Sequence, residues 1–126
     1  MIEGRFGENK ELFFEVIFVG ANGEQFSTEA LLDTGFTDGW LAINSQDLGA
    51  LGWSLITLQV NMQTARGSAK FNICSGKIII DGVEVIIPVH VGKNLPETIM
   101  GSLWLDVMRL VADKPSNILT LEIVQD

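Results

Sequence analysis

Short apolar runs separated by turn residues dominate the chain and predict a protein built from β-strands. The run Leu12–Val19 (LFFEVIFV) is followed by residues 20–23 (GANG), in which Asn-Gly is a strong hairpin signal. Extended sequence resumes over Gln25–Leu32, and residues 40–43 (WLAI) have the composition of a short buried strand. The first third of the chain is therefore predicted to form a hairpin followed by a third strand.

Two further hairpins are predicted in the middle of the chain. Residues 55–64 and 69–80 flank a small polar tip at residues 65–68 (ARGS). Asp81-Gly82 then forms a second tight turn between extended segments. Pro88 has no amide hydrogen to donate to a neighbouring strand, so it predicts a sheet edge or a strand end.

Helical sequence is confined to two short segments. Residues 45–51 (SQDLGAL) suffice for one or two helical turns, with Asn44 or Ser45 as the N-cap. Apolar residues recur at helical spacing over residues 102–108, and a turn at residues 114–117 precedes a last strand at residues 118–124. This rhythm of short strands and turns predicts an all-β fold, a small closed barrel with one short helix starting just after Gly101.

The overall composition limits the classes of partner. The chain has 126 residues, the size of one domain, and we expect residues 1–126 to form a single unit. Its net charge of −8 argues against nucleic acid or an anionic membrane as the main partner. The absence of a signal-like segment or a long apolar run leads us to expect a cytoplasmic protein. Cys74, the only cysteine, lies in apolar sequence and is expected to be a small buried hydrophobe.

The candidate chemistry centres on Asp33-Thr34-Gly35 at the end of an apolar strand. The tripeptide alone is a weak signal, because Asp and Gly are common in turns. A second signal, Ile99-Met100-Gly101, follows some 65 residues later and leads into the second helical segment. The lone histidine, His90, is expected to be a strand residue that faces outward or is hydrogen-bonded. No cluster of His, Cys and carboxylates has metal-site spacing, so neither a metal nor a cofactor is expected.

Together, these two segments resemble the paired signatures of retropepsin-like aspartic proteases, in particular the small single-domain prokaryotic members. Residues 31–37 (LLDTGFT) are similar to the active-site segment of that family, and residues 99–105 (IMGSLWL) are similar to its second signature. The resemblance implies that Asp33 is the catalytic carboxylate. It also implies that Thr34 grips a partner subunit and that Gly35 offers a backbone amide near the carboxylate.

The same resemblance assigns a substrate-covering flap to the central hairpin. The residues that would close over an extended peptide are Ala65, Arg66, Gly67 and Ser68. The chain contains no tyrosine, so a flap tyrosine of the pepsin type is excluded.

Aspartic proteolysis needs two carboxylates that share a proton, and this chain has a single Asp-Thr-Gly segment. The resemblance therefore implies an endopeptidase that acts on peptide or protein substrates as a twofold homodimer. We expect Leu12–Val19 and residues 118–124 to form its interface. Two alternatives stay open: a catalytically silent module of the same fold that binds peptides or serves in assembly, and an unrelated β-protein with a chance tripeptide.

Overall fold

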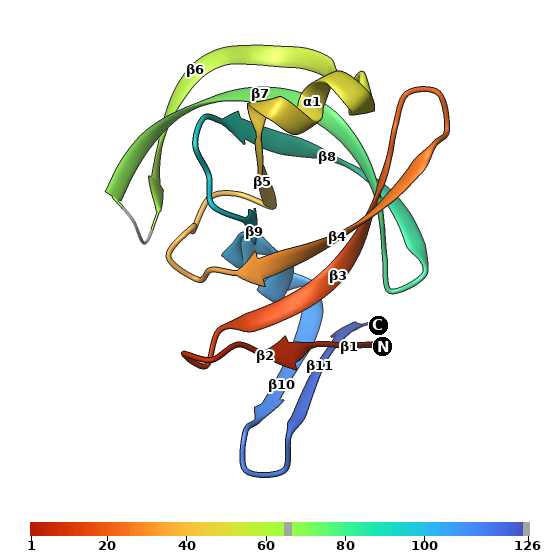
Figure 1. The fold of residues 1–126 in the computed structure, drawn as a ribbon, viewed down its shortest axis with the longest axis vertical. Helices are drawn as coiled ribbons and strands as arrows, with labels where there is room; N and C mark the ends of the chain where they lie inside the picture. The colour runs from red at the N-terminus through yellow and green to blue at the C-terminus, as the bar shows by residue number, and fades with distance from the viewer. Residues whose placement is uncertain (65–66, 125–126) are drawn as a thin grey trace.

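β-Strands make up most of the protein in the computed structural model, which describes residues 1–64 and 67–124 (Figure 1). The strands are β1 (Ile2–Glu3), β2 (Arg5–Phe6), β3 (Leu12–Val19), β4 (Gln25–Leu32), β5 (Leu41–Asn44), β6 (Ser54–Thr64), β7 (Gly67–Ile80), β8 (Val83–Gly92), β9 (Thr98–Met100), β10 (Met108–Asp113) and β11 (Ile118–Ile123). Helix α1 (Ser45–Leu51) and the 3-10 helix η1 (Ser102–Asp106) complete the described elements.

One sheet closes on itself to form a barrel. Its strands follow the order β2-β3-β4-β9-β5-β8-β7-β6, and residues 17–19 of β3 also pair with residues 77–79 of β7. That extra pairing joins β3, β4, β9, β5, β8 and β7 into a ring of six strands, and β2 and β6 extend beyond it. The predicted closed all-β barrel is confirmed.

Strands β3 and β4 form the first hairpin, as the sequence predicted. Phe14, Val16 and Phe18 alternate with more exposed residues along β3 and are buried in the main core. Neighbouring strands flank β3 on both edges, β2 and β4 near its start and β4 and β7 near its end. Both edges of β3 are thus occupied within the chain, and Phe14, Val16 and Phe18 fill the barrel, which leaves only the outward face of β3 for the subunit contact expected at Leu12–Val19.

Helix α1 spans Ser45–Leu51, the range that the sequence predicted. Asn44 occupies the N-cap position, but its side chain does not cap the helix. Its amide group instead donates to the Leu95 carbonyl and accepts the Leu95 N–H at 2.7 Å, which ties the start of the helix to the loop before β9. Within residues 1–64 and 67–124, no helix combines the length and apolar character needed to cross a bilayer.

The second helical segment starts at Ser102, as predicted, but is a 3-10 helix that ends at Asp106. Met108 begins strand β10, so the expectation of a helix through residue 108 is wrong there. The side chains of Met108, Leu119 and Leu121 are buried on one face of the β10–β11 hairpin, against the main core. This packing favours a strand over the helix that the local apolar spacing suggested.

The two ends of the described chain meet in a separate three-stranded sheet with the order β1-β11-β10. Ile2 pairs with Leu121, so the first and last strands lie side by side, and the β10–β11 hairpin extends away from the barrel (Figure 1). Strands β1 and β10 are the two end strands of this sheet.

At one end of the barrel sheet, opposite the end strand β2, lies β6. Its pairing with β7 is irregular at two places, between Leu55 and Thr57 and between Thr57 and Val60. Pro88 lies on β8, just before β5 joins at Val89, where β8 is paired with β7 alone. Pro88 therefore lies within β8 and not at its end, at a position where only one side of the strand is paired.

Candidate active site

The barrel brings the two sequence signals together. Strands β4 and β9 are parallel neighbours, and Leu31 pairs with Ile99 and Leu32 with Met100. Just beyond this pairing, the Asp33 N–H donates to the Met100 carbonyl at 2.9 Å. Asp33-Thr34-Gly35 and Ile99-Met100-Gly101, which are far apart in the sequence, therefore form one structural unit.

A tight turn, which we call the Asp33 turn (residues 33–37), presents the carboxylate. The Gly35 N–H donates to Asp33 Oδ1 at 2.8 Å, and the Phe36 N–H donates to the Asp33 carbonyl at 3.1 Å. These bonds fix the side chain of Asp33 against its own backbone, and its second carboxylate oxygen takes no part in them. Asp33 is half-buried and Thr34 is exposed, so both are accessible at the end of the strand.

Two glycines allow the chain to pack behind this turn. A β-carbon on Gly101 would lie 1.9 Å from the Gly39 carbonyl oxygen, and one on Gly39 would lie 2.0 Å from the Phe36 ring. The Ser102 N–H donates to the Phe36 carbonyl at 2.9 Å across the same contact. The segment that follows β9 therefore packs against the Asp33 turn and supports it. Only glycine fits at positions 39 and 101, where the two segments approach most closely.

A small apolar cluster lies beneath the Asp33 turn and connects it to the β6–β7 hairpin. Its buried members are Phe36, Ala42, Phe71 and Ile99, with Met62, Ala69 and Leu95 packed against them. The rings of Phe36 and Phe71 stack with centroids 6.3 Å apart. Sequence reasoning missed this role of Phe36; the available signal was an aromatic residue directly after Asp-Thr-Gly.

The residues assigned to the flap lie at the end of the β6–β7 hairpin. Ala65 and Arg66 fall outside the described residues. Gly67 opens β7 with φ +103°, which favours glycine, and Ser68 is exposed. Ala69 and Phe71 follow on the same strand and reach the cluster under the Asp33 turn, so the hairpin base contacts the candidate site.

The remaining candidate residues have structural explanations. Cys74 is a free, fully buried thiol whose pKa is raised by burial, as the interpretation of a small hydrophobe requires. His90 is buried and hydrogen-bonded to the backbone of Leu41, so it does not face outward. Asp38, Asp47 and Asp106 are exposed. In the described part of the chain, His, Cys, Asp and Glu form no group of three that could hold a metal.

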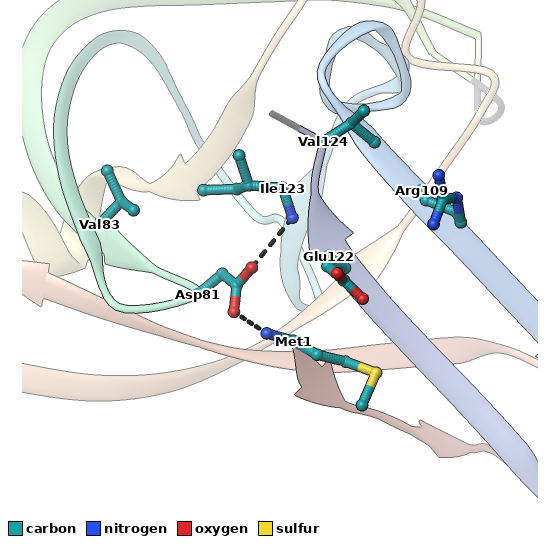
Figure 2. A pocket seen from close by; sticks show the side chains of 7 residues that line it. All are labelled: Met1, Asp81, Val83, Arg109, Glu122, Ile123 and Val124. Carbon is teal, nitrogen blue, oxygen red and sulfur yellow. Dashed lines mark hydrogen bonds and ion pairs between the residues drawn. The ribbon is translucent and has the colours of Figure 1, made fainter. Parts of the chain in front are cut away.

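A separate polar pocket lies where the terminal sheet meets the β7–β8 turn (Figure 2). Asp81 Oδ1 is paired with the Met1 ammonium group, and Oδ2 accepts the Ile123 N–H at 2.9 Å. The ammonium group, and then the Ile123 N–H, hold the pKa of Asp81 below its usual value. The elements around this pocket do not carry Asp33, so we interpret Asp81 as a tie between the chain ends and the barrel.

Comparison with known proteins supports the fold at the level of structure. No protein-family model matches the sequence, and no curated protein matches it. Among solved structures, a retropepsin-like aspartic protease from Rickettsia conorii superposes with a TM-score of 0.63 at 23% identity, covering 97% of this chain and 88% of its own. EIAV protease in complex with the inhibitor HBY-793 superposes with a TM-score of 0.59 at 19% identity. The superposition covers 80% of this chain and 90% of the EIAV protease chain. This chain therefore has the fold of the retropepsin-like aspartic proteases.

Proposed function

We propose that the protein is an aspartic endopeptidase that works as a homodimer, with one Asp33 from each subunit in a shared active site, and that residues 1–126 act as one domain. The observation that carries the proposal is the Asp33 turn itself. It stands at the end of β4, bonded to the Met100 carbonyl of β9, in a barrel of the retropepsin-like fold.

A pair of Asp33 carboxylates supplies the chemistry that peptide hydrolysis requires. Two carboxyl groups in contact cannot both ionise, so they share one proton and hold a water molecule between them. The ionised carboxylate takes a proton from the water, whose oxygen attacks the carbonyl carbon, while the protonated partner hydrogen-bonds to the carbonyl oxygen. The carbon–nitrogen bond then breaks as the nitrogen receives a proton, and the dyad returns to its starting state.

The neighbouring residues have supporting roles in this proposal. Thr34 is exposed next to Asp33, where its hydroxyl is available to a second subunit. The Gly35 N–H already donates to Asp33 Oδ1 and thereby fixes the orientation of the carboxylate. Ala65, Arg66, Gly67 and Ser68 would cover an extended peptide substrate from the hairpin above.

The surface best suited to pairing two subunits is the outer face of the β10–β11 hairpin. Val111 and Ile118 are 41% and 46% exposed there, on the face opposite the buried Leu119 and Leu121. The outer edge of β10 has no strand neighbour in the described chain. An exposed apolar edge of this kind is an aggregation hazard unless a partner covers it, which favours a second copy at this place.

The test is cleavage of a peptide library at mildly acidic pH by wild-type protein, Asp33→Asn and Asp38→Asn. Asp38 is a matched control, because it is an exposed aspartate in the loop that follows the same turn. We expect Asp33→Asn to abolish cleavage and Asp38→Asn to retain it. A folded wild-type dimer that cleaves nothing in the library, but binds an extended peptide, would favour the silent binding module instead.

A further inference from the structure

His90 is a buried ionisable side chain that the proposed reaction does not use. It is only 4% exposed, and its Nδ1 atom has no hydrogen-bond partner among residues 1–64 and 67–124. The hydrogen bond to the backbone of Leu41 is therefore made through the other ring nitrogen, Nε2. A buried nitrogen without a partner is uncommon, because an unsatisfied polar group in the interior costs free energy.

The imidazole lies between the Asp33 turn and the β6–β7 hairpin. Its ring meets the ring of Phe36, in the turn, edge to face at a centroid distance of 5.1 Å. On the hairpin side, it meets Phe71 in the same way at 5.7 Å. His90 thus completes the contact between the two elements, beside the direct stacking of Phe36 on Phe71.

The elements packed against His90 give it no charged partner. Strand β5, which pairs with it at Ala42, carries no ionisable side chain. Strand β7 pairs with it at Ile73; Lys70 on that strand is exposed, and Lys77 is paired with Glu84. Cys74 follows Ile73 directly and so faces the opposite side of β7. In the loop that carries Phe36, Asp33 is held by Gly35 and Asp38 points into solvent.

We propose that His90 makes the contact between the Asp33 turn and the β6–β7 hairpin sensitive to pH: the neutral imidazole holds Phe36 and Phe71 together, and uptake of a proton at Nδ1 separates them. Protonation would place a charge and an unsatisfied N–H donor in an apolar cluster, which favours a state where water reaches the ring. The proposal concerns the packing beneath the turn and holds whether or not Asp33 cleaves peptides.

The direction of the pH effect follows from the environment. Desolvation lowers the pKa of His90 in the folded protein, and the bond to Leu41 opposes this in part. The stabilisation by the neutral ring is therefore complete above the ordinary value of 6.5 and is lost as the pH falls through the folded pKa. Across that window, the unfolding equilibrium constant rises by up to about tenfold per pH unit. A pair of carboxylates that shares one proton is active at acidic pH. The β6–β7 hairpin would therefore loosen in the pH range in which the proposed enzyme is active.

The direct test is an NMR titration of the wild-type imidazole, which is unambiguous because the chain has one histidine. Long-range proton–nitrogen correlation spectra of folded, nitrogen-15-labelled protein from about pH 8 to about pH 4 report tautomer and protonation together. We expect a neutral ring protonated at Nε2 and a folded-state titration below 6.5. Titration at or above 6.5, as a charged ring stabilised by the faces of Phe36 and Phe71 would show, overturns the proposal.

The contact between the Asp33 turn and the β6–β7 hairpin is tested by amide hydrogen exchange in wild type, His90→Gln and Glu84→Gln. Glutamine keeps a nitrogen donor for Leu41 but cannot be charged, and Glu84 is an exposed carboxylate on the same strand that serves as the control. Exchange rates are first corrected for the intrinsic effect of pH. As the pH falls through the histidine transition, we then expect exchange to increase about fivefold or more in two segments, residues 33–37 and residues 67–72. This increase should occur in both wild type and Glu84→Gln. His90→Gln should show no such step. A step confined to β8, or one equally large in His90→Gln, overturns the proposal.

Discussion

Gly101 and Gly39 touch through their backbones: a β-carbon at position 101 would lie 1.9 Å from the Gly39 carbonyl oxygen and 2.6 Å from its carbonyl carbon. These are backbone atoms of the loop that follows the Asp33 turn, so they cannot move aside as the end of a flexible side chain can. The close approach packs the end of β9 against the loop that follows the Asp33 turn and makes residue 101 a sensitive point of the candidate site.

Gly101→Ala should therefore destabilise the protein by about 3 kcal/mol, the cost of forcing an extra methyl group into a packed interior. Gly101 has φ −83°, which alanine adopts freely, so the effect is steric. Gly49→Ala is the matched control, because nothing lies within 4 Å of its β-carbon position in helix α1. That change should be neutral or stabilising by up to about 1 kcal/mol. Urea unfolding measures both, and similar losses would contradict the packing argument.

A shared active site has a consequence for mixed subunits. When wild-type chains and an equal amount of Asp33→Asn chains exchange freely, random pairing leaves about a quarter of the dimers fully wild-type. Activity per wild-type chain should then fall to about half, because asparagine cannot act as general base in the mixed dimers. Peptide cleavage is measured against mutant fraction after subunit exchange has been verified. If added mutant leaves activity per wild-type chain untouched, each chain works alone.

The proposed dimer surface is tested by placing charges on the β10–β11 hairpin. Val111→Lys with Ile118→Lys should weaken self-association by about tenfold or more, because each lysine must be desolvated in the interface. Val83→Lys is the control: Val83 has similar exposure but lies at the β7–β8 turn. Sedimentation at several concentrations gives the association constants. Equal weakening by the control, or a wild-type monomer at tens of micromolar, would count against this surface.

Cys74 should react slowly with thiol reagents while the protein is folded. The side chain is fully buried and burial raises its pKa, so both access and the thiolate fraction are reduced. We expect labelling at least about a hundredfold slower than in urea-unfolded protein, limited by opening of the barrel. Moving the thiol one position, with Cys74→Ala and Ser75→Cys, places it on the other face of β7 and should restore fast labelling. Fast reaction of the native thiol would show that the core is open at this strand.

Asp81 predicts a loss of stability in acid. Its folded pKa lies below the usual 3.8, so its contribution is present above that value and disappears as the pH falls through the folded pKa. Asp81→Asn keeps an acceptor for the Ile123 N–H and tolerates the φ of 51° at this turn, but it removes the charge. Wild type should therefore be more stable than Asp81→Asn near neutral pH, and the difference should shrink as the pH falls below 3.8. Asp106→Asn, an exposed control on η1, should show no such convergence.

The sequence predicted best those elements that local signals determine. Strands β3 and β4 were predicted to the residue because alternating apolar positions and an Asn-Gly turn lie within one short stretch. The end of the second helical segment was mispredicted for the same reason. The apolar spacing up to Met108 is helical, but pairing of Met108 with Ile123 of β11 decides the outcome, and that partner is not visible locally.

The position of the candidate site was predictable from the sequence, but its packing was not. Asp33 and Gly101 could be identified because the two signals occur in a recognisable order, and the structure places them together. The neighbours of Phe36 were not predictable, since Phe71 and His90 reach it only when the barrel closes. Burial of His90 likewise depends on strands β5 and β7, which flank it from distant parts of the chain.

The irregular pairing of β6 with β7 limits the ability of this edge strand to pair with a strand of another molecule. Leu55, Ile56 and Leu58 are exposed along it, and a straight strand with these side chains would be a template for fibril growth. The two register shifts and the positive φ of Gln59 bend and twist the strand instead, so its free N–H and C=O groups do not align in a regular row. The defects in the ladder thus protect the protein against cross-β stacking while leaving the hairpin apolar.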